Sequence, residues 1–309
     1  MLLNTFLGTT YPFMQGGMAQ VATGAFAADV CKAGALGIIA SGGKTAQQVR
    51  DEIKVLRKKT DKPFGVNVMM MAPNVDELAA VLVEEAVPVI TTGAGNPAKY
   101  LDGWKQAGSI VIPVIPSVAL AQRMERYGAD AVVAEGTESG GHVGELATMA
   151  LVPQVADAVS IPVIAAGGVA SGRQFCAALA LGAIGAQMGT ALLVSEECPI
   201  HDNYKRMLLE AKDTSTTVTG RDQGSPTRIL KNRMAREYHK LEQESADREA
   251  LEALTLGSLR KAVFDGNKDE GSFMAGQVAG QLQRIEPLAA IFQRLMEEYE
   301  QTRKELPAL

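Results

Sequence analysis

Short apolar runs recur along the chain, and each is bounded by glycine or proline. LGIIAS (36–41) and IVIPVI (110–115) are typical, since their residues are apolar without alternation. Such runs are characteristic of strands buried on both faces, as in a parallel sheet covered by helices. The eight predicted strands span residues 12–18, 36–41, 63–69, 88–93, 110–115, 130–135, 162–168 and 186–190.

Helical patterns lie between these runs. They include AAVLVEEA (79–86), VALAQRMERYG (118–128) and RQFCAALALG (173–182), and two of these end in glycine, which is common after a helix C-terminus. Eight strand–helix units between residues 12 and 190 predict an α/β protein with a (β/α)8 TIM barrel. A doubly wound parallel sheet would use fewer strands and is the alternative.

This rhythm stops after Val194. We predict that residues 1–199 and 266–309 form the barrel, and that the charged segment 200–265, which lacks short β runs, is a small, mostly helical insertion covering the barrel mouth. Within it, residues 246–263 have the pattern of an amphipathic helix. The tail from Gly271 to Leu309 is predicted to be helical again, with Pro287 marking a break or a helix start.

Composition narrows the functional classes. With 309 residues, 47% hydrophobic and only 5% aromatic, the chain can bury a large aliphatic core. The net charge of −5 argues against nucleic acid as the main partner. Cys31, Cys176 and Cys198 show no metal-binding spacing and are predicted to be buried thiols of a reduced compartment. Without a signal-peptide pattern or a long apolar run, we expect a soluble cytoplasmic protein with no metal site and no membrane contact.

Glycines gather after the seventh and eighth predicted strands, in AAGGVASGRQ (165–174) and QMGT (187–190). Barrels of this type often bind phosphate with these two loops. The N–H groups of Gly167 and Gly168 could turn toward an anion, and the following helix would add its N-terminal dipole. The alternative is a tight turn in which Ser171 caps the helix.

Three further elements follow predicted strands or the insertion. QGGMA (15–19) lets backbone approach a flat ligand, Asn67 offers a donor and an acceptor, and FMAGQVAG (273–280) presents Gln277. Each alone is compatible with a turn or a packing glycine. Together with the phosphate loops they predict a large planar phosphorylated cofactor.

In this order, QGGMA, Asn67, ESGGHVG, AAGGVASG, QMGT and MAGQ resemble the FMN-dependent enoyl-acyl-carrier-protein reductases of the second type (FabK-like), which are relatives of the nitronate monooxygenases. The resemblance runs nearly from end to end, including DTSTTVTGR (213–221). It implies a TIM barrel that binds FMN, and a homodimer. It also implies reduction of trans-2-enoyl groups on acyl carrier protein with NADH, favoured over NADPH, in fatty acid elongation. A monovalent cation is a further requirement that the resemblance suggests.

The resemblance also assigns residues. Around the flavin ring and ribityl chain it places Gly17, Met18, Ala19, Ser41, Asn67 and Glu135. It assigns the phosphate to Gly167, Gly168, Gly189 and Thr190, with Gln187 and Met188 in the same loop as the last two. Met274 and Gln277 would approach the cofactor from the C-terminal segment.

His142 lies in EGTESGGHVG (135–144), which is too poor in apolar residues to predict helix or strand. A histidine on a glycine loop after the sixth strand could reach the substrate face of a flavin and donate a proton near neutral pH. We predict that His142 is catalytic, and the alternative is a filler role. His201 and His239, at or in the charged insertion, are interpreted as solvated or capping residues.

Two surfaces bear on the substrate. Met69, Met70 and Met71 either floor an acyl channel or belong to the core. The segment 227–240 carries five basic residues and one acid, so it is either a docking surface for acidic acyl carrier protein or a solvated helix face.

Two other functions remain open. One is nitronate monooxygenase, in which the loop histidine acts as a base, and the other is a flavin-free phosphate-binding isomerase or lyase. The long insertion and the ESGGH form of the loop favour the reductase.

Overall fold

The computed structural model describes residues 1–306 and contains a barrel of eight parallel strands. The strands are β1 (Phe13–Gln15), β2 (Gly37–Ala40), β3 (Phe64–Met69), β4 (Val89–Gly93), β5 (Ile110–Ile115), β6 (Val132–Glu135), β8 (Val163–Ala166) and β9 (Ala186–Met188). Their order is β1-β9-β8-β6-β5-β4-β3-β2. Each lies inside one predicted range, so the TIM barrel is confirmed and the doubly wound sheet is wrong.

Hydrogen bonds between β1 and Leu36, the residue that precedes β2, close the barrel. Gln15 N donates to Leu36 O at 2.9 Å, and Leu36 N donates to Phe13 O at 3.0 Å. On its other side β1 pairs with β9 in the register Phe13↔Ala186. The sheet therefore has no free edge.

Successive strand residues face different cores, which explains why the strands are continuously apolar. Ile38 belongs to the aliphatic cluster inside the barrel, together with Val89 and Ile112. Its neighbour Ile39 packs in a cluster with residues of the covering helices, such as Ile53. Both faces of the strand thus need apolar side chains.

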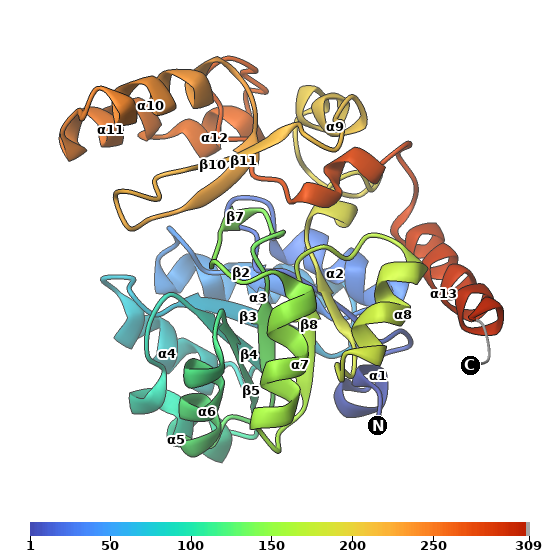
Figure 1. Cartoon of the computed structure of the whole chain (residues 1–309). Coiled ribbons are helices and arrows are strands. Elements are labelled where there is room, and N and C mark those ends of the chain that lie inside the picture. The colour runs from blue at the N-terminus through green and yellow to red at the C-terminus, as the bar shows by residue number, and fades with distance from the viewer. Residues whose placement is uncertain (307–309) are drawn as a thin grey trace.

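Helices cover the outside of the barrel (Figure 1). They are α2 (Gly24–Ala33), α3 (Ala46–Lys59), α4 (Val75–Glu84), α5 (Ala98–Gln106), α6 (Val118–Arg126), α7 (Thr148–Ala158), α8 (Gly172–Ala180) and α13 (Leu288–Glu305), while α1 (Leu3–Leu7) lies at the other end of the barrel from β7. Helix α4 begins four residues before the predicted range of 79–86. Asp76 and Glu77 in its first turn suit the positive end of the helix dipole.

Residues 190–287 form the remaining elements. They are η1 (Thr190–Leu192), α9 (Asp202–Leu209), β10 (Thr216–Thr219), β11 (Thr227–Leu230), α10 (Arg233–Gln243), α11 (Arg248–Thr255), α12 (Ser258–Val263) and η2 (Gln277–Gln281). In Figure 1 the part from β10 to α12 lies beyond one end of the barrel, next to β7 (Gly141–His142). The predicted boundaries of the insertion at 199/200 and 265/266 stay a prediction.

The predicted insertion contains mostly helices, but it also contains two strands that its sequence did not predict. β10 and β11 pair antiparallel, and β11 also pairs with β7, giving a three-stranded sheet. The threonine-rich sequence of β10 favours strand through its β-branched side chains, although it is only partly buried. The segment around His142 was predicted to be neither helix nor strand, and it is a short strand because β11 supplies its partner.

Two helix predictions also need correction. The predicted helix 246–263 is divided into α11 and α12, because Gly257 adopts the left-handed conformation with φ of 70°. Before Pro287 the tail contains only the short η2, and α13 begins directly after that proline. Residues 307–309 of the predicted tail lie outside the described residues.

Candidate active site

The ends of β1, β2, β3 and β4 meet at one edge of the barrel. A Cβ at Gly17 would collide with the side chain of Asn67, so only glycine allows this approach. Asn67 Nδ2 donates to Thr91 Oγ1 at 2.9 Å, and Asn67 O accepts from Ser41 N at 3.0 Å. The structure therefore brings together Gly17, Ser41 and Asn67, which belong to three different loops or strand ends.

Several buried polar groups at strand ends and in the loop after β6 have no hydrogen-bond partner in the described part of the chain. Ser41 is 2% exposed, and its Oγ makes no hydrogen bond. Within residues 1–306, Gln15 Nε2 and Thr137 Oγ1 are also without partners. Since an unsatisfied buried polar group costs about 1–3 kcal/mol, these groups fit a ligand with polar atoms.

The turn after β8 presents backbone donors. Gly167 and Gly168 have φ of 87° and 76°, in the left-handed region that favours glycine. A Cβ at Gly167 would lie 2.8 Å from Gly136 O, so side chains are also excluded by space. Neither glycine N–H donates a hydrogen bond within residues 1–306. A turn of this kind can bind an anion through its N–H groups.

The turn after β9 provides a second pair of donors. The N–H groups of Gly189 and Thr190 likewise make no hydrogen bond in the described structure. A Cβ at Gly189 would lie 3.4 Å from Met18 Sδ, which places the loop after β1 beside this turn. The preceding residues Gln187 and Met188 are buried in β9. Met188 O accepts from Gly16 N at 2.8 Å.

The N-terminus of α8 is already occupied by protein groups. Ser171 Oγ accepts from Gln174 N at 3.3 Å, and Gln174 Oε1 accepts from Ala170 N at 2.9 Å. Gly172 N donates to the Glu298 carboxylate at 2.7 Å. The capping role of Ser171 is thus confirmed, and the Gly172 N–H is already bonded to Glu298, so the contribution of this helix dipole to anion binding stays a prediction. The glycine N–H groups remain as the donors.

Glu135 ends β6 and is partly buried. Burial raises the pKa of its carboxyl to about 7, and the nearby Ser139 side chain opposes this rise. Near neutral pH the carboxyl can therefore hold a proton and donate a hydrogen bond, which an ordinary exposed glutamate does not do.

Glu138 also lies at the site, although the sequence did not predict it as a site residue. Its carboxylate accepts from Thr148 N at 2.9 and 3.0 Å and from Thr148 Oγ1 at 3.0 Å, at the start of α7. A Cβ at Gly168 would lie 3.6 Å from Glu138 Cβ, so this side chain borders the glycine turn. Its partners are ten residues away along the chain, and no local pattern indicates them.

The C-terminal segment packs against the loop after β6. Gln277 N donates to Glu138 O at 2.9 Å, although the residue itself is exposed. Met274 O accepts from Tyr204 Oη at 2.7 Å, and a Cβ at Gly141 would lie 3.5 Å from Met274 Sδ. Gly276 N donates to Thr190 Oγ1 at 2.8 Å. Met274 and Gln277 thus lie beside the loops that carry the other predicted site residues.

His142 is exposed and lies opposite Thr227 in the β7–β11 register. Its side chain makes no hydrogen bond within residues 1–306. Ala19 lies near the end of β2, since a Cβ at Gly42 would be 3.9 Å from Ala19 Cβ. The catalytic role of His142 stays a prediction.

The other histidines have structural roles. His201 caps α9, where its Nδ1 accepts from Asn203 N at 3.0 Å, so the capping interpretation is confirmed. His239 bonds to Thr217 Oγ1 at 2.9 Å and to Glu242 at 3.1 Å. Its side chain is 35% exposed, so it is partly solvated as predicted, and it also links α10 to β10.

The two substrate surfaces change in the structure. Met70 is 9% exposed and packs in the core, whereas Met69 and Met71 are exposed, so the three do not form one floor. In the basic segment, Arg228 is only 6% exposed and does not belong to the surface.

The three cysteines are buried and free, as predicted.

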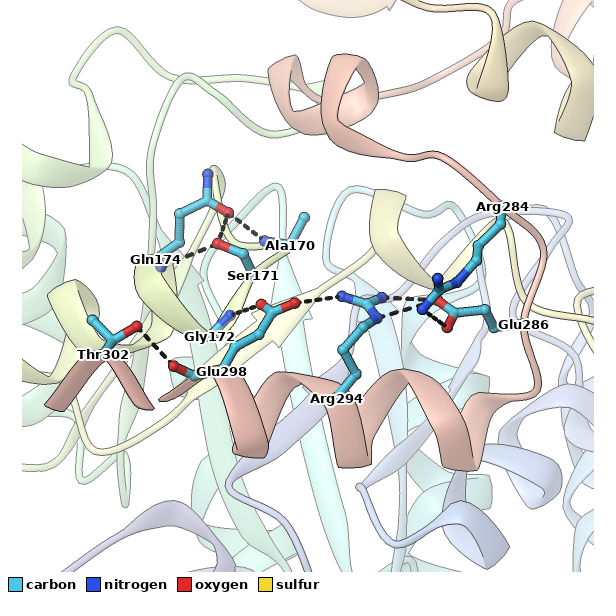
Figure 2. Close-up of polar contacts among 9 residues, drawn as sticks. All are labelled: Ala170, Ser171, Gly172, Gln174, Arg284, Glu286, Arg294, Glu298 and Thr302. Atoms are coloured by element: carbon cyan, nitrogen blue, oxygen red, sulfur yellow. Dashed lines mark hydrogen bonds and ion pairs between the residues drawn. The ribbon is translucent and has the colours of Figure 1, made fainter. Parts of the chain in front are cut away.

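A cavity of about 770 Å³ lies outside the barrel mouth, between α8, α13 and residues 280–284. Figure 2 shows ion pairs among four of the charged groups that line it: Arg294 contacts Glu286 at 3.0 Å and Glu298 at 3.2 Å, and Arg284 contacts Glu286 at 2.8 Å. None of the predicted cofactor-binding residues lines it. This cavity is therefore not the candidate active site.

The described residues contain neither a metal-binding cluster nor a membrane-spanning helix. Within residues 1–306, no group of three or more His, Cys, Asp or Glu side chains could hold a metal ion. In the same range, no helix has the length and apolar character needed to cross a membrane.

Comparisons with known proteins agree with this geometry. The family model described as "Nitronate monooxygenase" matches residues 1–86 and 76–298. The chain is 32% identical to "(3aS,4S,5R,7aS)-5-hydroxy-7a-methyl-1-oxo-octahydro-1H-indene-4-carboxyl-CoA dehydrogenase" of Mycobacterium tuberculosis, over 90% of both chains. It is 33% identical to a "Probable nitronate monooxygenase" of Staphylococcus aureus, over 89% of this chain and 90% of that protein. The solved structure of FabK from Thermotoga maritima is 46% identical, with a TM-score of 0.96 over 98% of this chain and 97% of that one.

Proposed function

We propose a function from the premise that this chain belongs to the nitronate monooxygenase family, a family of oxidoreductases. Within that family, we propose that it is an FMN-dependent enoyl-acyl-carrier-protein reductase. It would reduce trans-2-enoyl thioesters with NADH or NADPH, with NADH favoured. The observation that carries this choice is the 46% identity and TM-score of 0.96 to FabK, against 32–33% identity to the other two relatives.

The residues at the barrel mouth fit FMN. Gly17 leaves room for a flat ring beside Asn67. The buried Ser41 Oγ has no hydrogen-bond partner within residues 1–306, and a bound ligand could provide one. The four N–H groups at 167, 168, 189 and 190 suit a phosphate. We propose that Gly17, Met18, Ala19, Ser41, Asn67 and Glu135 hold the ring and ribityl chain, with Met274 and Gln277 beside them. When bound, FMN supplies hydride transfer between a nicotinamide and a thioester, which no side chain can perform.

The chain's own groups would direct protons and charge. Glu135, with its pKa raised to about 7, can donate a hydrogen bond to a ligand acceptor near neutral pH. His142 would donate to the thioester oxygen as negative charge develops there, an interaction that contributes about 3–4 kcal/mol in comparable sites. The insertion above the mouth would limit access of water.

The name of one relative supports a thioester substrate. The Mycobacterium tuberculosis protein is called a carboxyl-CoA dehydrogenase, so a related chain acts on a coenzyme A thioester. The second candidate function is nitronate monooxygenase, favoured by the family model and by the Staphylococcus aureus relative. In that case His142 would act as the base. A homodimer, a cytoplasmic location and a monovalent cation stay predictions.

Steady-state assays separate the two functions. We expect purified protein that releases FMN on heating, and NADH-dependent turnover of crotonyl thioesters on coenzyme A and on acyl carrier protein. Turnover of an alkyl nitronate with oxygen should be far slower. Fast nitronate oxidation without thioester reduction would establish the second candidate instead. Colourless folded protein that cannot be loaded with FMN would contradict both.

A further inference from the structure

Arg228, in β11, is a buried cation without an acidic partner. Its residue is 6% exposed, and it forms no ion pair within residues 1–306. Burial lowers the pKa of its guanidinium, the positive charge of Arg221 adds to this, and Glu138 opposes it. A cation in this position is unusual, because a buried charge without a direct ion pair is costly even where a nearby carboxylate such as Glu138 partly balances it.

The guanidinium binds the loop that follows β6. Its Nε and Nη2 both donate to Thr137 O, at 3.1 and 2.9 Å. Its Nη1 donates to Thr216 Oγ1 in β10 at 3.2 Å. Thr137 lies between Glu135, with its raised pKa, and Glu138, which borders the glycine turn. The side chain therefore links the hairpin of the insertion to the beginning of this loop.

The same hairpin holds the other end of the loop. In the β11–β7 register Arg228 lies opposite Gly141, and Thr227 lies opposite His142. Val143 N donates to Pro226 O at 3.1 Å. Backbone pairing thus fixes the loop near His142, while the Arg228 side chain fixes it near Glu135.

We propose that Arg228 is a positioning residue that holds the loop of residues 135–143, so that Glu135 and His142 keep their places relative to the barrel mouth. The planar guanidinium directs two donors at one carbonyl, which fixes the orientation of the peptide and not only its distance. This inference rests on the proposed function for its kinetic consequence. Its structural consequence, an ordered loop, is independent of the substrate.

The test compares Arg228→Gln and Arg228→Lys with the control Arg221→Gln. The control removes a nearby exposed charge without touching Thr137. We expect faster amide hydrogen exchange in residues 137–143 of both Arg228 variants and parent-like exchange in the control. For crotonyl thioester, kcat should fall about 10–100-fold with KM near the parent value, since small misplacements of catalytic groups have effects of this size. Arg228→Lys keeps the charge and most of the volume of the side chain. If Arg228→Gln does not fold, hydrogen exchange and kcat of Arg228→Lys therefore decide the test.

Parent-like amide hydrogen exchange in residues 137–143 of folded Arg228→Lys, or a parent-like kcat of this variant, would overturn the proposal. Either result would mean that a positive charge alone orders the loop, without the two hydrogen bonds from the guanidinium. Failure of the proposed function is distinguishable. If the parent protein does not reduce enoyl thioesters, the exchange measurement still decides whether Arg228 orders the loop.

Discussion

The raised pKa of Glu135 makes the stability of the protein depend on pH. Burial raises its pKa from 4.5 to about 7, so the folded protein binds more protons than the unfolded chain between these two values. The stability from the protonated form is fully present below pH 4.5 and is lost as the pH rises toward 7. In the cofactor-free protein, this change amounts to about 3 kcal/mol, since one pKa unit corresponds to about 1.4 kcal/mol.

We therefore expect Glu135→Gln, which cannot ionise, to lose less stability than the parent between pH 4.5 and pH 7. Thermal or denaturant unfolding of cofactor-free protein at several pH values measures this difference. The exposed Glu145→Gln is the matched control and should follow the parent. Parallel pH curves for parent and Glu135→Gln would show that the carboxyl is not buried in the way described.

His142 is the residue on which turnover should depend. We expect His142→Ala to retain FMN and its reduction by NADH, because the side chain is exposed and is not among the proposed phosphate donors. Turnover of crotonyl thioester should fall about 10²–10³-fold, the usual loss of an oxyanion donor. Stopped-flow measurement of each half-reaction separates the two effects. Turnover at the parent rate would leave His142 without a catalytic role.

At the scale of elements, the glycine turn after β8 is the clearest binding feature. Gly168 has φ of 76°, and a Cβ there would make only ordinary contacts, the nearest at 3.6 Å. Gly168→Ala should therefore strain the backbone by about 1–2 kcal/mol and disturb the N–H groups offered to the phosphate. We expect FMN affinity to fall about tenfold or more, measured by fluorescence titration of cofactor-free protein.

Gly128→Ala is a matched control. Gly128 has φ of 90° and open space around the Cβ position, and it directly follows Tyr127, the C-cap of α6. It carries a comparable backbone strain without contact to the proposed phosphate loop. Equal weakening of FMN binding in both variants would mean that the loss reflects general destabilisation.

The sequence predicted the barrel elements well because both faces of each strand are buried, which makes the runs continuously apolar. Local signals could not predict the β10–β11–β7 sheet, since its strands are short and β7 becomes a strand only through a partner more than eighty residues away. The break at Gly257 is a local feature that the helical pattern obscured. Glu138 and Arg228 depend on contacts between distant segments, and their roles appear only in the folded chain.

At the scale of the whole molecule, a net charge of −5 makes docking of an acidic carrier depend on a local basic surface. In the structure, fewer basic residues of segment 227–240 are available for docking than the sequence predicts. Arg228 is buried, Arg233 lies 3.4 Å from Glu270, and Lys240 lies 3.7 Å from Glu244. Lys231 and Arg236 are exposed and make no ion pair in the described part of the chain.

We expect Lys231→Glu combined with Arg236→Glu to raise KM for carrier-bound substrate about fivefold to tenfold, corresponding to about 1 kcal/mol of lost attraction. The increase should be larger at low salt, and KM for the coenzyme A thioester should change little. Lys54→Glu combined with Lys58→Glu on α3 is the control for an equal change in net charge. An equal increase with both double variants would place the docking surface elsewhere.

The central claim is that the barrel mouth holds a flavin and passes reducing equivalents to an enoyl thioester. The most direct test is an anaerobic single turnover, in which protein loaded with FMN is first reduced by one equivalent of NADH and then mixed with crotonyl thioester. We expect rapid reoxidation of the flavin and one equivalent of butyryl thioester. A flavin that stays reduced with crotonyl thioester, and is reoxidised only when oxygen is admitted, would contradict it.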